Sequence, residues 1–267
     1  MMKKLIAMIM ALTMVFSFAA CGGSDDAASG GEEDTAMVYA VEAGSAGEAA
    51  AAENGWQYNS VADQATALME VSAGTSDAAI IDLLMAGAMI GEGTSYPDLV
   101  YTDKLTTEEY GVGCRQGSDL VDVINAVFYN AYTDGTMQTV AKEYGVQESL
   151  VEQAECSYEI AADGDVAYIQ EKGKLVVGVT EFAPMDYLDA NNEWIGFDAD
   201  MARLVAEELG VDIEFVVIDW DMKINEVNAK NIDCVWNGMT LTSEVMNAMD
   251  CSNPYCNNAQ VVVVPAE

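Results

Sequence analysis

From residue 37 onward, short apolar runs alternate with stretches of helical periodicity, and this alternation is what most restricts the possible folds. An apolar period of two residues predicts strands, and a period of 3.6 residues predicts helices. Strands are predicted at residues 37–42, 77–81, 110–114, 174–179, 211–218, 232–236 and 259–264. Helices are predicted at residues 47–53, 62–73, 83–91, 118–134, 136–144, 198–209 and 223–230. The chain is therefore expected to form α/β layers, and its periodicity favours two small lobes over one large domain.

The first twenty residues have the layout of a cleaved secretory signal peptide, with two lysines, an apolar stretch at residues 5–18 and small residues before Cys21. That stretch is short for a bilayer-crossing helix, which needs roughly twenty residues. Cys21 resembles the acylated cysteine of a bacterial lipobox, although Phe18 stands where that pattern usually has leucine. A lipidated Cys21 would anchor the protein to the outer face of the cell membrane, and the alternative is an ordinary secreted protein. Residues 21–36 lack large apolar side chains and are predicted to be a flexible tether.

The composition is strongly acidic, with 45 Asp and Glu against 10 Lys and Arg and a formal net charge of −35. This balance excludes nucleic-acid binding. It favours solubility and surface repulsion, and the alternative interpretation is a preference for cationic solutes. The chain has no histidine, which removes the usual general base, the usual transition-metal ligand and any Ser-His triad. The sequence predicts no catalytic residue, no metal site and no cofactor.

Five cysteines follow Cys21, an odd number without the paired CxxC spacing of zinc sites. Cys251 and Cys256 are close enough in sequence for a local disulfide outside the cytoplasm. Free buried thiols are the equally weighted alternative.

Two short strand-to-helix turns are candidate binding elements, at residues 41–47 and 237–242. Ligands bind at such strand ends in open α/β sheets, and the N-terminal amides of the following helix attract anions. Glycines in the first turn allow close approach of the backbone, and the second turn brings hydroxyls to a helix expected near Ser243. Taken alone, the first turn favours a simple tight connection over a binding site, and the second turn is a weak signal.

The run Gly196-Phe197-Asp198-Ala199-Asp200 is similar to a signature of the polar amino-acid binding proteins that serve bacterial ABC importers. Residues 174–264 resemble the N-terminal half of that family almost end to end. Residues 37–105 resemble its second lobe, and residues 109–145 resemble its return crossing and closing helices. The resemblance covers about 220 residues and implies a two-lobed, type II periplasmic-binding-protein-like α/β fold.

These blocks stand in the reverse of the family order, so the chain looks like a circular permutant. The resemblance implies a ligand-binding lobe 2 at residues 37–109 and a lobe 1 at residues 110–264, with an acidic linker at residues 147–165 joining the family's usual termini. One crossing between lobes, near residues 110–115, would remain continuous. A single crossing predicts lobes that open more widely than in an unpermuted relative.

The resemblance also implies a ligand site for a small zwitterion between the lobes. Asp82 matches the carboxylate that receives the ligand ammonium, and its alternative role is an N-cap for the following helix. The resemblance implies that Ser45 and Ala46 form a turn whose backbone amides bind the ligand carboxylate. It also implies that Gly238 and Thr240 bind the ligand from lobe 1, and that Phe182 and Trp220 form aromatic walls. Tyr187 is a further wall candidate, and core packing is the alternative for all three aromatics.

Val245 departs from the family pattern, which places an arginine there to pair with the ligand carboxylate. The only arginines, Arg115 and Arg203, match no cleft position. Glu42 stands where some relatives carry a basic residue. These departures favour a ligand with less anionic character, including an organic cation held against aromatic faces.

The predicted function is a lipid-anchored receptor that captures a small polar amino acid or related amine and presents it to an ABC transporter permease. A ligand-sensing module is the alternative, whose signalling partner would be a separate protein because the chain ends just after its last strand. A dehydratase-like enzyme on the same fold is disfavoured, since no nucleophile lies beside a base.

Overall fold

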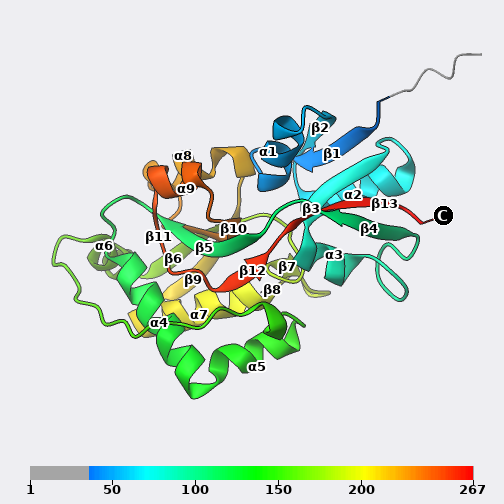
Figure 1. Ribbon diagram of the computed structural model, residues 1–267. Coiled ribbons are helices and arrows are strands. Elements are labelled where there is room, and N and C mark those ends of the chain that lie inside the picture. Colours follow the sequence, from blue (N-terminus) through cyan, green and yellow to red (C-terminus); the bar gives the residue numbers. More distant parts are fainter. Residues whose placement is uncertain (1–35, 267) are drawn as a thin grey trace, which may run out of the picture. The chain divides into compact units, whose positions relative to one another are not determined.

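The computed structural model describes residues 36–266, which form one compact unit. Its strands build two main sheets and a small two-stranded ribbon (Figure 1). The first sheet has the order β2-β1-β3-β13-β4, and the second has the order β11-β5-β10-β6-β9 with β12 paired to β5. The predicted signal peptide, Cys21 and almost all of the tether lie outside the described residues.

The first sheet combines the beginning of the described chain with its end. Its strands are β1 (Val38–Glu42), β2 (Gln57–Val61), β3 (Ala78–Asp82), β4 (Leu99–Lys104) and β13 (Gln260–Pro265), and its helices are α1 (Ala46–Glu53), α2 (Gln64–Ala73) and α3 (Leu83–Met89). Strands β1, β2 and β3 are parallel, whereas β13 runs antiparallel to both β3 and β4. Alternate residues of a strand face opposite sides, so Val41 packs with Ala51 of α1 while Ala40 packs in the cluster that contains Leu68 of α2.

The second sheet is built from β5 (Glu108–Cys114), β6 (Lys174–Val179), β9 (Asp212–Val217), β10 (Cys234–Thr240), β11 (Asp250–Cys251) and β12 (Cys256–Asn258). Its helices are α4 (Leu120–Asp134), α5 (Thr136–Glu143), α6 (Asp165–Lys172), α7 (Phe197–Leu209), α8 (Lys223–Asn228) and α9 (Ser243–Ala248), with 3-10 turns η1 (Gln147–Ser149) and η2 (Trp220–Met222) and the ribbon β7 (Tyr187–Leu188) and β8 (Trp194–Ile195). Helix α7 forms where sequence predicts it. Its apolar residues Met201 and Val205 are fully buried four positions apart, and Gly210 ends it in the left-handed conformation at φ 71°.

All fourteen predicted strands and helices have an observed counterpart, with boundaries shifted by a few residues at most. The largest omissions are β2, β4 and α6, whereas α9 begins at Ser243, where the sequence analysis expects a helix. Strand β2 has four exposed residues among five, and β4 has five among six, so neither carries an apolar pattern. The predicted linker at residues 147–165 begins with the 3-10 turn η1 and ends at Asp165, the first residue of α6.

The chain passes between the two sheets twice, so the predicted loss of one crossing is wrong. The first crossing leads from β4 to β5, and the second leads from β12 to β13. Residues 260–264 had been expected in lobe 1, but Val261 and Val263 are fully buried in β13 between β3 and β4. The other expected boundary, between residues 109 and 110, falls inside β5. With two continuous crossings, the expectation of unusually wide opening loses its physical basis.

Among residues 36–266, no helix has the length and apolar character needed to cross a bilayer. The same residues contain five free cysteines, of which Cys114, Cys234 and Cys256 are buried. The local disulfide between Cys251 and Cys256 is therefore not formed, and the free-thiol alternative holds in this structure.

Candidate functional site

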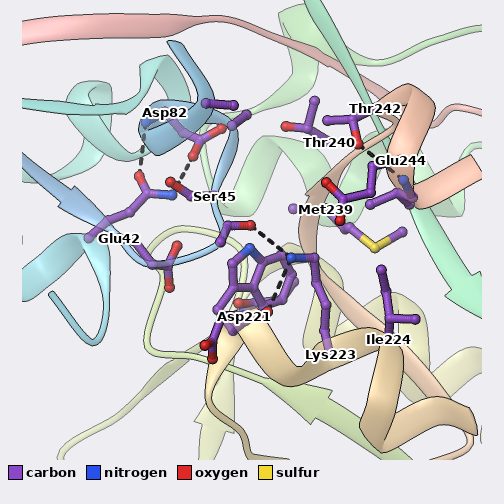
Figure 2. A pocket seen from close by; sticks show the side chains of 18 of the residues that line it. Glu42, Ser45, Asp82, Asp221, Lys223, Ile224, Met239, Thr240, Thr242 and Glu244 are labelled. Carbon is purple, nitrogen blue, oxygen red and sulfur yellow. Dashed lines mark hydrogen bonds between the residues drawn. The ribbon is translucent and has the colours of Figure 1, made fainter. Parts of the chain in front are cut away.

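A cavity of about 340 Å³ has walls from both sheets and contains all seven residues predicted to bind ligand. Its lining comprises Glu42, Gly44, Ser45, Ala46, Ala49, Gln64 and Asp82 from the first-sheet side and Phe182, Trp220, Asp221, Lys223, Ile224, Asn237, Gly238, Met239, Thr240, Thr242, Ser243, Glu244 and Val245 from the second. Figure 2 shows Glu42 and Asp82 on one side, Thr240, Thr242 and Glu244 on the other, and Lys223 between them. The volume suits a small molecule.

The Asp82 carboxylate accepts hydrogen bonds from four other side chains of the protein. Its Oδ1 accepts hydrogen bonds from the Tyr110 hydroxyl at 2.6 Å, from Gln260 Nε2 at 3.2 Å and from the Asn258 amide, while Gln64 donates to Oδ2. The residue occupies the N-cap position of α3, but its side chain makes no capping bond. Burial, followed by the nearby Glu108 carboxylate, raises the pKa of Asp82 to about 7. Because four side chains already donate to this carboxylate, few of its acceptor positions remain for a ligand. The four donors come from segments that are far apart in sequence.

The first turn is shaped by Gly44 and Ser45. Gly44 has a φ of +70°, and a Cβ built on it would lie 2.6 Å from the Asp221 Cα on the other side of the cavity. Ser45 caps α1, since its Oγ accepts from the Glu48 amide at 3.1 Å. Helix α1 therefore begins at Ala46 with its N-terminal amides beside the cavity, the arrangement the sequence predicts for carboxylate binding.

The second turn is formed by the end of β10 and the start of α9. Thr242 caps α9 by accepting from the Val245 amide at 3.2 Å, which places the helix start at Ser243 as predicted. The Thr240 hydroxyl donates to Glu108 at 3.1 Å. The Gly238 amide donates to Asp198 Oδ2 at 2.6 Å, so this amide is already occupied within the protein.

Asp198 explains the signature run in structural terms. It is fully buried at the start of α7, and its Oδ2 accepts from both the Gly238 amide and the Tyr255 hydroxyl, the latter at 2.7 Å. It thereby fixes the β10 turn that lines the cavity. The sequence analysis missed this positioning role, although the signature itself pointed to the residue.

The aromatic predictions have different outcomes. Phe182 and Trp220 line the cavity but are also buried, at 3% and 7% exposure, so wall and core roles coincide. Asp219 and Asp221 flank Trp220 in sequence, yet Trp220 packs in a cluster with Val176, Ile218 and other apolar residues. Tyr187 lines a different cavity, together with Tyr144 and Met89, and does not belong to this site.

Lys223 is the only basic residue lining the cavity within the described chain, and the sequence analysis missed it as a site residue. Its Nζ donates to the Gly44 carbonyl at 2.8 Å and to the Trp220 carbonyl at 3.1 Å. Burial lowers its pKa. Val245 lines the cavity where the resemblance implies an arginine, while Arg115 and Arg203 lie outside the lining, as expected. The cavity thus has four acidic residues, Glu42, Asp82, Asp221 and Glu244, and one lysine.

Glu42 is the least satisfied of these groups. It is 3% exposed, and its Oε1 is buried without a hydrogen-bond partner among the described residues. Burial, followed by the carboxylates of Asp82 and Asp63, raises the pKa of Glu42 to about 8, against lowering contributions from the Gln64 side chain and then from Lys223. A buried carboxylate whose oxygen has no hydrogen-bond partner binds a proton or a cation far more readily than an exposed carboxylate does.

The raised pKa values of Glu42 and Asp82 predict that the folded protein loses stability as the pH rises. Both groups bind protons more tightly in the folded state, so their contribution is complete below about pH 4 and is lost progressively up to about pH 8. We expect the melting temperature to fall between pH 5 and pH 8, and to fall less in Glu42→Gln. Melting curves at constant ionic strength test this, and an equal pH slope in the variant would contradict it.

Comparison with known proteins finds similarity in the C-terminal third of the chain. Residues 175–267 match the family described as bacterial extracellular solute-binding proteins, family 3. A probable histidine-binding protein of Neisseria gonorrhoeae is 37% identical over 34% of this chain and 34% of its own length. An arginine-binding extracellular protein of Bacillus subtilis is 31% identical over 34% of this chain and 36% of its own length. The chain thus spans about a third of the length of the curated relatives it matches.

A solved structure, the arginine-bound form of a truncated arginine-binding protein from T. maritima, is 35% identical over 30% of this chain and 39% of its own, with a TM-score of 0.30. The family match covers β6 to β13 and includes the Gly196–Asp200 signature and the β10 turn. The mixed sheets and covering helices fit the type II periplasmic-binding fold that the resemblance implied. Residues 175–267 of the chain are thus similar to the bacterial extracellular solute-binding proteins, family 3.

Proposed function

We propose that the protein captures a small polar amino acid or related amine in the cavity between its two sheets. The observation that carries this proposal is the cavity's lining. Seven residues chosen from sequence, widely separated along the chain, gather around one space of about 340 Å³. Relatives are named for binding histidine, arginine and cystine, and this range supports an amino-acid-like ligand without selecting one.

The N-termini of α1 and α9, beyond the amides that Ser45 and Thr242 cap, direct their dipoles toward an anionic group, while the acidic lining provides for a cationic one. In this proposal Phe182 and Trp220 enclose the apolar part of the ligand. Val245 removes a charge-assisted contact to the carboxylate, so the anionic group is held more weakly than where an arginine is present. Asp82 acts mainly through the donors around it, and the acidic lining as a whole gives the cavity a field that favours a cation.

We further propose that the protein works outside the cytoplasm as the binding component of an ABC importer, delivering its ligand to a permease, with lipidated Cys21 as its membrane anchor. Support for the importer role comes from relatives named as ABC transporter binding proteins. We also propose that the two halves of the family stand in exchanged order in this chain, because residues 175–267 match the family model and residues 37–105 resemble the family's second lobe. The names of the matched relatives describe binding proteins, and no enzymatic activity is proposed.

A thermal-shift screen of the chain from Gly22 tests the binding function. We expect at least one of the twenty common amino acids, polyamines or quaternary amines to raise the melting temperature, because a ligand at a hundred times its Kd adds about 2.7 kcal/mol of stability. The control is Gly238→Val, whose side chain would enter the Phe182 ring and block the cavity. Absence of any shift at millimolar ligand would contradict the proposal.

A further inference from the structure

The proposed function leaves open what recognises the cationic part of the ligand. Asp82 is surrounded by four donors of the protein. Asp221 and Glu244 are exposed, and water satisfies exposed carboxylates at little cost. Glu42 differs from all three, since it is almost completely buried, lines the cavity and has an oxygen with no partner in the described chain.

Lys223 is the basic residue in the cavity lining, but it does not pair with Glu42. Its Nζ is directed to the carbonyl oxygens of Gly44 and Trp220, and no ion pair between Lys223 and Glu42 is formed in residues 36–266. Gly44 follows Glu42 by two residues, so the lysine is bound to the backbone beside the carboxylate rather than to the carboxylate itself. Buried polar groups nearly always have a partner, and an unpaired buried acceptor is costly.

We propose that Glu42 accepts the cationic nitrogen of the ligand and makes the cavity select ammonium or guanidinium compounds over neutral compounds of the same shape. This inference rests on the proposed function and names the ligand class of the same site. A ligand nitrogen placed against Glu42 would satisfy its free oxygen, and the surrounding acids would add a favourable field. Charge selectivity therefore comes from one buried side chain at the end of β1.

Calorimetry with matched ligand pairs tests this proposal. L-arginine is compared with L-citrulline, and putrescine with 4-amino-1-butanol, since each pair differs in one charge at nearly constant shape. The wild-type protein is expected to bind the more highly charged member of at least one pair about tenfold more tightly or better. In Glu42→Gln this preference is expected to fall to about twofold or less, and Glu42→Asp is expected to retain part of it.

Glu244→Gln is the matched control, because it removes the same charge from the same cavity at an exposed position. We expect it to keep the preference. A preference that is unchanged in Glu42→Gln, in a protein that still binds, would overturn the inference and leave the proposed function intact. Binding of amino acids with uncharged side chains alone, with an affinity unchanged in Glu42→Gln, would also overturn only the inference, whereas binding of no amine or amino acid would overturn both. Melting curves without ligand confirm that each variant is folded.

Discussion

Replacing Asp233 with alanine is expected to lower the free energy of unfolding by about 3 to 5 kcal/mol. Asp233 is fully buried before β10 and accepts from Lys172 Nζ at 2.6 Å and from the Val176 amide at 2.7 Å. Arg115 lies 3.6 Å from it and also contacts Asp165 at 2.9 Å. Removal of the carboxylate leaves Lys172 Nζ and the Val176 amide without this acceptor, and it takes a buried negative charge away from Arg115.

Chemical denaturation with urea measures this loss. Lys174 and Glu214 form a second ion pair on the same sheet, but both side chains are nearly half exposed. The matched substitution Glu214→Ala is expected to cost less than about 1 kcal/mol, because solvent screens such a pair. Equal losses in the two variants would show that burial does not decide the contribution of Asp233.

Replacing Gly44 with valine is expected to weaken ligand binding by roughly a hundredfold. The new Cβ would lie 2.6 Å from the Asp221 Cα, and backbone atoms cannot move aside as a flexible side chain does. The walls of the cavity must then separate at this point, which also breaks the bond from Lys223 to the Gly44 carbonyl. A cost of about 3 kcal/mol for such overpacking corresponds to this loss of affinity.

Gly55→Val is the control for the backbone conformation. Gly55 has a φ of +68°, close to that of Gly44, but nothing lies within 4 Å of a Cβ built on it. Both variants should lose stability through the left-handed conformation, by about 1 to 2 kcal/mol, and only Gly44→Val should lose affinity. Titration of both with the ligand found by thermal shift decides the matter, and undiminished affinity in Gly44→Val would rule out close contact of the two walls in the bound state.

The sequence by itself determined the order and type of most elements, because apolar periodicity survives wherever one face of a strand or helix is buried. Helix α7 and strand β6 are examples, and β2 and β4 were missed because their side chains are mostly exposed. The sequence also placed Ser45, Asp82, Phe182 and Gly238 in one site through local motifs that resemble a family.

Only the tertiary structure decided the pairing of β13 with β3 and β4, since a short apolar strand fits either sheet equally well on its pattern alone. It also decided the electrostatic roles in the cavity. Asp82 and Glu42 are both acids at strand ends, yet one meets four donors from distant segments and the other has an oxygen with none. Lys223 reaches Gly44 across 179 positions of sequence. Such contacts depend on how the two sheets face each other, and no local pattern of residues encodes that arrangement.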